Sequence, residues 1–367
     1  MQKMLIFFIL ILVGYLLGNI YIFVRGIQAL GHLSFAFRIT FIVLYWLCAL
    51  LLFASFAFRN SQQIPFSIGH AVFQIGAGWL VFILYMVVFL VCADLIKLFN
   101  KSFSYGFVIS LILTASTLLY GFINYKHPKK QVINIFINKS VEGVDKLKIV
   151  AISDWHLGFG TDKNQLKKNI DLINAEKPDI ILIGGDLIDN STVPVASQEM
   201  DKELNRLEAP MGIYLAPGNH EYISGIKKCE EFLSKTKIQL LKDMTTTLPC
   251  GLQIIGRDDY GNEKRLSTSH WKSMTDSSKP IIIVDHQPHN LFEAQDIGAD
   301  IQFSGHTHYG QIFPLNLLTN YLFDISYGYE KRSQTHYYVS SGLALWGPPF
   351  RIGTDSEIVV FELSFAK

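Results

Sequence analysis

Residues 148–189 read KIVAISDWHLGFGTDKNQLKKNIDLINAEKPDIILIGGDLID, and this stretch decides the fold of the later part of the chain. The apolar runs Lys148–Ser153 and Asp179–Gly184 predict two buried strands. Between them, Asn164–Glu176 repeats its apolar residues at helical spacing and predicts an amphipathic helix. A strand, a helix and a second strand at this spacing form a βαβ unit, which is typical of a parallel α/β sheet.

Later apolar runs extend this pattern toward the end of the chain. The further predicted strands are Ile213–Ala216, Leu252–Ile255, Ile281–Val284, Ile301–Phe303 and Glu357–Leu363. We therefore predict an α/β domain over residues 147–367, preceded by a connecting segment and a first strand over residues 128–146.

The first third of the chain has a different composition. Four apolar runs there each contain about 20 residues, enough to cross a hydrocarbon core of about 30 Å. They cover residues 4–24, 37–58, 72–91 and 105–125. The first run is too long for a signal-peptide core and no A-x-A-like site follows it, so we expect it to be retained. The sequence predicts an all-α transmembrane module of four helices over residues 1–127.

The charge distribution supports this division. Residues 1–126 carry seven basic residues and a single acid, Asp94, which we expect to pair with Lys97 at a membrane edge. Of the basic residues that flank the four runs, five lie on the side of the membrane that holds the α/β domain and four on the other side. Because basic residues are more frequent on the cytoplasmic side, this difference weakly favours a cytoplasmic position for the α/β domain. The chain is thus expected to be a multi-pass protein of the cell membrane with lipids as partners, and its oligomeric state is not indicated.

Overall composition excludes two classes of protein. Lys and Arg total 32 against 31 Asp and Glu, so binding of nucleic acid through an excess of basic charge is not expected. Aromatic residues make up 13% of the chain and the net charge is only +1, which excludes a disordered polymer.

Five predicted strands are each followed by potential metal ligands. These clusters are Asp154–His156, Gly185–Asp189, Gly218–Glu221, Asp285–His286 and Gly305–His308. Ligands of α/β sheets bind beyond the carboxyl ends of the strands, so the five clusters are expected to converge. Asp154 and His156, like His306 and His308, are two residues apart and point to the same side of an extended segment.

The chemistry of these side chains favours two metal ions. Carboxylate, imidazole and amide donors suit manganese, iron or zinc, and we favour Mn²⁺. Seven candidate ligands exceed the four of a tetrahedral zinc site, but they suit two divalent ions that share one carboxylate. Such a pair attracts anions, generates hydroxide near neutral pH and clamps a phosphoryl group. The sequence therefore predicts a metal-dependent phosphohydrolase.

The succession D-x-H, G-D-x-x-D, G-N-H-E, a lone histidine after a strand, and G-H-x-H resembles the calcineurin-like metallophosphoesterase family over about residues 147–364. The C-terminal stretch is similar to that of its membrane-associated or exported bacterial members. The resemblance implies a four-layer α-β-β-α sandwich. It also implies that Asp154, His156 and His308 hold one ion, that Asn219, His286 and His306 hold the other, and that Asp186 bridges both.

Further roles follow from the same resemblance. His220 would bind the substrate phosphate and protonate the leaving oxygen, while Asp189 and Glu221 would orient ligand imidazoles. Arg351 is a candidate phosphate contact, with an ordinary surface arginine as the alternative. The sequence departs from the family pattern at Tyr309, which stands where a glycine is usual. Ala344 also replaces a usual glycine, and both departures bear on the substrate pocket.

The expected substrate is a phosphate ester, with a phosphodiester or pyrophosphate preferred over a monoester. The membrane module favours a lipid-linked or cell-envelope substrate. The alternative is a non-catalytic, metal-dependent membrane sensor or transport-associated protein. A zinc hydrolase of the metallo-β-lactamase type is not supported, because its H-x-H-x-D-H run is absent from the sequence. Histidines 270, 289 and 336 are expected to be structural, and Trp155 is expected to be a packing residue.

Overall fold

The protein is described by a computed structural model that covers residues 2–367, with side chains from Ile9 onward. Met1 and the side chains of residues 2–8, where the predicted first span begins, lie outside the described residues. The chain forms two compact units. The helical unit comprises Met1–Ile123 with Gly347–Phe350, and the α/β unit comprises Asn124–Trp346 with Arg351–Lys367. The domain boundaries at residues 127 and 146 stay predictions.

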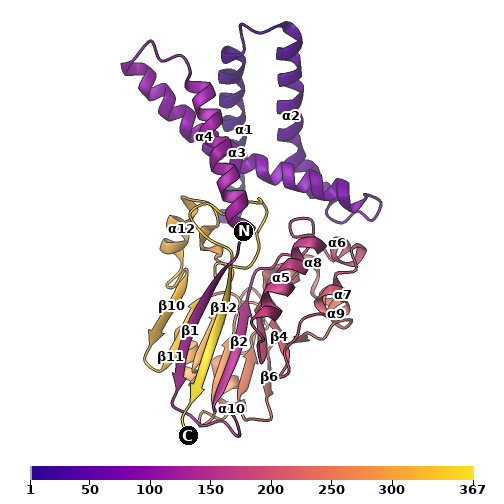
Figure 1. Ribbon diagram of the computed structural model, residues 1–367, viewed down its shortest axis with the longest axis vertical. Helices are drawn as coiled ribbons and strands as arrows, with labels where there is room; N and C mark the ends of the chain where they lie inside the picture. The colour runs from indigo at the N-terminus through magenta and orange to yellow at the C-terminus, as the bar shows by residue number, and fades with distance from the viewer. Residues whose placement is uncertain (1) are drawn as a thin grey trace. The chain divides into compact units, whose positions relative to one another are not determined.

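Four long helices make up most of the helical unit (Figure 1). They are α1 (Gln2–Ala29), α2 (Phe35–Phe58), α3 (Phe66–Phe99) and α4 (Gly106–Tyr125). Each is long and apolar enough to cross a membrane. Helix α3 extends well beyond the predicted run 72–91, because no proline intervenes between Pro65 and Asn100.

Asp94, the acid of the membrane module, does not pair with Lys97 as the sequence predicted. The Asp94 carboxylate accepts a hydrogen bond from the Tyr21 hydroxyl at 2.6 Å and forms an ion pair with Arg25. Both partners lie on α1, whereas Lys97 is on α3 with Asp94. The expected pair with Lys97 is therefore wrong, and Asp94 instead ties α3 to α1.

The α/β unit contains, among the residues that the structure describes, two six-stranded sheets. The first has the order β1-β12-β2-β3-β4-β5, and the second has the order β10-β11-β9-β8-β7-β6. The strands of the first sheet are β1 (Lys129–Ile137), β2 (Lys146–Ile152), β3 (Ile180–Gly184), β4 (Ile213–Ala216), β5 (Gln239–Leu240) and β12 (Glu357–Phe365). Those of the second are β6 (Met244–Thr247), β7 (Gln253–Gly256), β8 (Ile281–Val284), β9 (Ile301–Ser304), β10 (Gly328–Arg332) and β11 (Thr335–Val339).

Shorter helices connect these strands. They are α5 (Lys163–Ala175), α6 (Val193–Ser197), α7 (Met200–Leu204), α8 (Asn219–Ser224), α9 (Ile226–Leu233), α10 (Thr268–Met274), α11 (Phe292–Ile297), α12 (Leu315–Leu322) and the 3₁₀ turn η1 (His308–Gly310). Strands β2, β3 and β4 are mutually parallel, as are β7, β8 and β9. Their carboxyl ends therefore fall at one edge of each sheet.

Alternation along the strands builds the layers of the unit. In β2, Val150 and Ile152 pack in a core with Leu166 of α5. Ile149 and Ala151 point to the opposite face and pack in a core shared with strands of the second sheet. The outer face of the second sheet packs in a third core that includes residues of α10 and α11. The predicted α-β-β-α sandwich is confirmed.

Candidate metal centre

The loops after β2, β3, β4, β8 and β9 bring the predicted ligand clusters together. Three groups of carboxylates and imidazoles each place their possible ligand atoms within 4.8 Å of one another. The groups are Asp154 with His156 and His308, His156 with Asp186 and His220, and Asp186 with His286 and His306. His156 and Asp186 each belong to two groups, so the three form one continuous cluster.

The backbone at these positions adopts an unusual conformation. Five predicted ligands have positive φ angles: Asp154 at 53°, His156 at 44°, Asp186 at 52°, His306 at 71° and His308 at 47°. This left-handed region costs a residue other than glycine about 1–3 kcal/mol, and such strain concentrates at functional sites. The strained positions coincide with the predicted ligands, which supports a functional role for the cluster.

Two glycines permit the close approach of the loops. A Cβ atom at Gly218 would lie 2.2 Å from Asp186 Oδ1, and one at Gly305 would lie 2.4 Å from Asp154 Oδ2. Any side chain at either position would displace a carboxylate of the cluster. The glycines of G-N-H-E and G-H-T-H are therefore needed for packing against the two aspartates.

The first part of the cluster surrounds Asp154. Its Oδ1 atom lies 3.3 Å from His308 Nε2, and the Nε2 atoms of His156 and His308 are 3.1 Å apart. Both oxygens of Asp154 also accept the backbone N–H of His306 at 3.1 Å. All three side chains of this group are buried, and their ligand atoms face one another.

The second part lies around Asp186 and Asn219. His286 Nε2 is 3.2 Å from Asp186 Oδ2 and 3.2 Å from Asn219 Oδ1, which also lies 3.0 Å from His306 Nδ1. His286 Nδ1 donates to the carbonyl of Gly184 at 2.7 Å, and this bond leaves Nε2 unprotonated in a neutral ring. A fixed tautomer of this kind is typical of a histidine that ligates a metal.

His220 and Asp189 lie next to this cluster. The Nδ1 atoms of His220 and His156 lie 3.0 and 3.3 Å from Asp189 Oδ1, so one carboxylate orients both rings. Burial lowers the pKa of His220, but Asp189 and Asp186 outweigh burial and raise it to about 9. His220 also donates its backbone N–H to Asp186 Oδ1 at 2.8 Å.

Glu221 supports the loops instead of facing the ligand atoms. Its fully buried carboxylate accepts three backbone N–H groups, from Asp186 and Ile188 at 3.0 Å and from Gly218 at 2.7 Å. Burial and the neighbouring Asp186 raise the pKa of Glu221 to about 7. This residue joins the loop after β3 to the loop after β4.

The pKa values of four ligand side chains favour the binding of cations. Burial opposes ionisation of Asp154 and Asp186, but nearby histidines outweigh it, and the pKa of each carboxyl lies below its ordinary value. Burial lowers the pKa of His306 to about 3 and that of His308 to about 4. Burial also acts to lower the pKa of His286, but Asp186 outweighs it and raises that pKa well above its ordinary value. Ionised carboxylates and neutral imidazoles are the forms that bind metal ions, so binding would release the proton of His286. The buried clusters are consistent with a dimetal site.

Arg351 is fully buried, so it is not a surface arginine. Its Nη1 donates to the carbonyl of His308 at 2.9 Å. Its Nη2 donates to the carbonyls of Ser341, Gly342 and Ala344 at 2.5, 3.2 and 2.7 Å. These bonds fasten the His308 loop to residues 341–344. A direct phosphate contact of Arg351 stays a prediction, whereas no sequence motif indicated its bonds to backbone carbonyls.

Asp285, which precedes His286, belongs to a separate ion network. Its carboxylate accepts a hydrogen bond from Arg265 at 2.9 Å and lies 3.5 Å from Arg257. Arg257 in turn pairs with Glu293. Sequence adjacency had grouped Asp285 with His286, but alternation along the strand end directs the two side chains to different surroundings.

Aromatic side chains border the second part of the cluster. The ring centroids of Phe323 and His306 are 5.9 Å apart. The His289 ring makes tilted contacts with Phe323 and Tyr260, at centroid distances of 5.2 and 4.5 Å. Tyr309 stacks on Tyr327 at 4.7 Å. No sequence motif marks Phe323, because it follows His306 only after an intervening helix. Trp155 is fully buried in the core, as expected of a packing residue.

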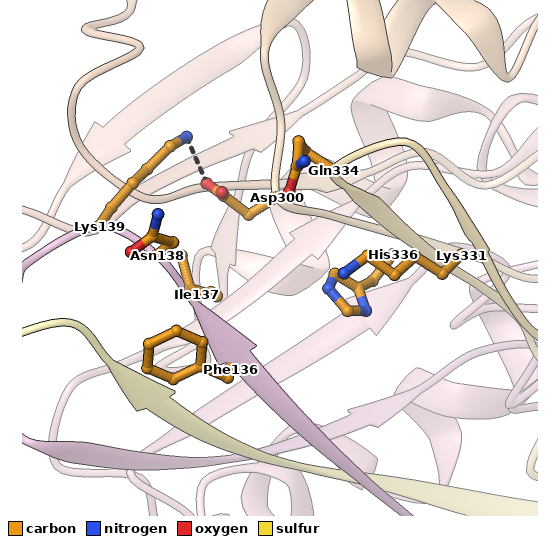
Figure 2. Close-up of a pocket in the computed structure, with 8 residues that line it drawn as sticks. All are labelled: Phe136, Ile137, Asn138, Lys139, Asp300, Lys331, Gln334 and His336. Atoms are coloured by element: carbon orange, nitrogen blue, oxygen red, sulfur yellow. Dashed lines mark hydrogen bonds and ion pairs between the residues drawn. The ribbon is translucent and has the colours of Figure 1, made fainter.

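A pocket of about 260 Å³ lies elsewhere in the α/β unit (Figure 2). It is lined by Lys139, Asp300, Lys331 and His336 among others, and Lys139 forms an ion pair with Asp300 at 2.7 Å. Asp300 immediately precedes β9, whereas His306 follows it. The pocket and the metal cluster therefore lie at opposite ends of this strand.

Comparisons with known proteins agree with this geometry. A family model described as calcineurin-like phosphoesterase matches residues 147–310. An uncharacterized metallophosphoesterase of Campylobacter jejuni is 31% identical over 99% of each chain. One of Helicobacter pylori is 36% identical over 64% of each chain. A transmembrane protein with a metallophosphoesterase domain from Danio rerio is 30% identical over 71% of this chain and 63% of that protein.

The strand-end cluster, the sandwich and these relatives lead to one assignment. The likeness to the Campylobacter jejuni protein extends over 99% of each chain, so it covers the sequence of both units and is not confined to short motifs. This chain belongs to the calcineurin-like metallophosphoesterase family of metal-dependent phosphoester hydrolases, and it carries N-terminal membrane helices.

Proposed function

We propose that this protein is a membrane-anchored, dinuclear-metal phosphohydrolase that cleaves a phosphodiester or pyrophosphate bond of a lipid-linked or cell-envelope substrate. The observation that carries the proposal is the convergence of carboxylates and imidazoles from separate loops into three overlapping groups, two of which share Asp186. Two divalent ions with one bridging carboxylate need such an arrangement. A single tetrahedral ion would use only about four of these ligands.

The donor set fits two divalent ions. Asp154, His156 and His308 would hold the first ion, since their ligand atoms face one another in a buried group. Asn219, His286 and His306 would hold the second, and Asp186 lies in groups with residues of both sets. Hard-to-borderline donors of this kind favour Mn²⁺, with iron or zinc as alternatives.

When bound, the two ions would clamp the phosphoryl group and activate the attacking water. His220 would bind the phosphate and protonate the leaving oxygen. Asp189 holds His220 Nδ1 at 3.0 Å, so Nε2 is the ring atom left for the substrate. Asp189 and Glu221 would act indirectly, the first through His156 and His220 and the second through the backbone of Asp186.

Activity of the full-length protein tests the proposal directly. Purified protein in detergent, supplied with Mn²⁺, is expected to hydrolyse a generic aryl phosphodiester. Asp186→Ala should lower the rate by at least about 100-fold, because electrostatic stabilisation of the transition state is lost. Asp171→Ala is the matched control, since the Asp171 side chain is 56% exposed on α5. Equal activity in wild type and Asp186→Ala would contradict the proposal.

The cytoplasmic side is proposed for the α/β unit because basic residues flanking the helices weakly favour it. Protease added to intact and to opened cells distinguishes the two orientations. A cytoplasmic unit is digested only after the cells are opened. Digestion in intact cells would place the unit outside and would restrict the substrate to lipids of the outer surface.

A further inference from the structure

Helix α12 follows the metal-ligand loop and exposes an apolar surface. Residues 309–323 read YGQIFPLNLLTNYLF and contain no charged side chain. Six apolar side chains on and beside α12 are between 47 and 86% exposed. They are Phe313, Leu315, Leu317, Leu318, Tyr321 and Leu322. We call these six residues the α12 surface. Contiguous exposed apolar surfaces of this kind mark interaction sites.

The polarity of α12 is the reverse of that in an ordinary surface helix. In a water-exposed helix the apolar face packs on the core and the polar face meets solvent. Here Asn320 accepts a hydrogen bond from Ser326 of the same unit, and the backbone of Asn316 lies against Gly310. Asn316 and Thr319 are half-buried and Asn320 is exposed, while Leu315, Leu317 and Leu318 are all exposed. The less exposed positions of α12 are thus polar, and its leucines face outward.

A chain of hydrogen bonds connects α12 to the end of a membrane helix. Asn124, the penultimate residue of α4, donates to the carbonyls of Arg351 at 3.2 Å and Thr354 at 2.8 Å. The Thr354 hydroxyl donates to the carbonyl of Gln311 at 2.9 Å, and the Phe313 N–H donates to the carbonyl of Ile352 at 2.7 Å. The segment that begins α12 is therefore tied to the residues that Asn124 binds.

The end of α4 is also fixed within the α/β unit. Tyr125 is 2% exposed and packs in the same core as Trp155 and Leu343. Strand β1 begins only four residues later, at Lys129. The last two residues of α4, Asn124 and Tyr125, are thus hydrogen-bonded and packed within the α/β unit, to which α12 also belongs.

From these observations we infer that α12 lies in the membrane interface, with the α12 surface in contact with the lipids of the bilayer. The reversed polarity supplies the apolar face that an interfacial helix buries. The hydrogen bonds from Asn124 place this face near the end of a membrane-spanning helix. The absence of charge over residues 309–323 removes the desolvation cost that Lys, Asp or Glu would impose.

This contact would bring lipid to the metal cluster. Gly310 is two residues after His308, and a Cβ atom at Gly310 would lie 2.3 Å from the backbone nitrogen of Asn316. At the other end, Phe323 follows α12 and contacts the ring of His306. Helix α12 thus begins against Gly310, two residues after His308, and is followed by a residue that contacts His306. Resting on the proposed function, this geometry selects a phosphate ester carried by a lipid over one free in solution.

The depth of α12 in a bilayer tests the inference without measuring hydrolysis. A nitroxide-bearing amino acid is introduced at Leu318 of the full chain, which is then reconstituted in vesicles of phosphatidylethanolamine and phosphatidylglycerol. Met274 of α10 is the matched control, because it is 53% exposed. Figure 1 shows α10 and α12 at opposite ends of the α/β unit. Tyr321, 86% exposed, provides a second labelled position if Leu318 does not tolerate the label.

Oxygen concentrates in the hydrocarbon region, whereas a charged nickel chelate stays in water. The ratio of oxygen to nickel collision rates should be about tenfold higher at position 318 than at position 274. Equal ratios would show that α12 lies in water. Exclusion of both reagents with spin–spin broadening would show that a second copy covers α12. Either result overturns the inference, and neither depends on whether the protein hydrolyses phosphate esters.

Discussion

Replacing Arg351 with methionine tests whether a buried cation holds the ligand loops in place. Methionine retains an apolar stem but removes the donors to four carbonyls, one of them that of His308. Hydrogen bonds from a charged group contribute about 1.5–3 kcal/mol each. Burial of the guanidinium costs several kcal/mol, so the net loss of unfolding free energy is expected to be about 3–5 kcal/mol.

The loss is measured as a change in Tm of the α/β unit, followed by circular dichroism in detergent at a fixed scan rate. For a unit of 150–250 residues, each kcal/mol shifts Tm by about 2–4 °C, so Arg351→Met should lower Tm by about 6–20 °C. Titration with Mn²⁺ should show about 10- to 100-fold weaker binding, since the His308 loop loses its support. Arg206→Met is the matched control, because the Arg206 side chain is 40% exposed, and its Tm should stay close to wild type.

Two outcomes would refute this reasoning about Arg351. A Tm and a Mn²⁺ affinity equal to those of Arg206→Met would show that the four carbonyls need no cation. If those quantities are unchanged but KM for an aryl phosphodiester rises, Arg351 contacts the substrate, as the sequence suggested. Arg351→Lys should fall between wild type and Arg351→Met, because one ammonium retains the charge without the planar fork of donors.

Three further predictions concern other groups. Burial raises the pKa of Glu357 above its ordinary value of 4.5. The folded chain then binds this proton more tightly than the unfolded chain, so the contribution of Glu357 to stability is present below pH 4.5 and is lost as pH rises through the folded pKa. The Tm of wild type should therefore fall relative to that of Glu357→Gln as pH increases from 4.5. A constant difference between the two Tm values over this pH range would contradict the prediction. Mn²⁺ at about 100 times its Kd should stabilise the protein by about 2.7 kcal/mol. EDTA should reverse that gain in a thermal melt, and the gain should be absent from Asp186→Ala. Tyr125→Ala should lower the free energy of unfolding by about 3–5 kcal/mol, because it opens a cavity in the α/β core. Tyr120→Ala, at a position 57% exposed on the same helix, should leave the melt nearly unchanged.

The parallel strands and the ligand cluster followed from local sequence patterns. In residues 148–184, two continuous apolar runs predicted buried strands, and apolar residues at helical spacing between them predicted the helix of a βαβ unit. Strands β4 and β8 have the predicted bounds, because each is a short apolar run between turn residues. Convergence of the clusters followed from a topological rule, since parallel strands present their carboxyl ends at one edge.

Features that depend on distant parts of the chain could not be predicted in this way. Strand β10, with its exposed GYEKR sequence, lacks an apolar pattern and exists through pairing with β11. The partners of Arg351 are backbone carbonyls, which every residue has, so no side-chain motif reveals them. Helix α12 reads as an apolar helix, but only its tertiary placement shows that the leucines point outward.

Two buried side chains explain how the strained ligand loops persist. The Glu221 carboxyl group accepts three backbone N–H groups from the loops after β3 and β4. Arg351 is a buried cation that gathers four carbonyls, including that of His308 in the loop after β9. The positive φ angles at Asp186 and His308 would relax in a free loop. The hydrogen bond from the Asp186 N–H to Glu221 and that from Arg351 to the His308 carbonyl restrain the backbone at both positions. The ligand geometry is therefore built by the chain itself, and we expect metal ions to stabilise the loops without reshaping them.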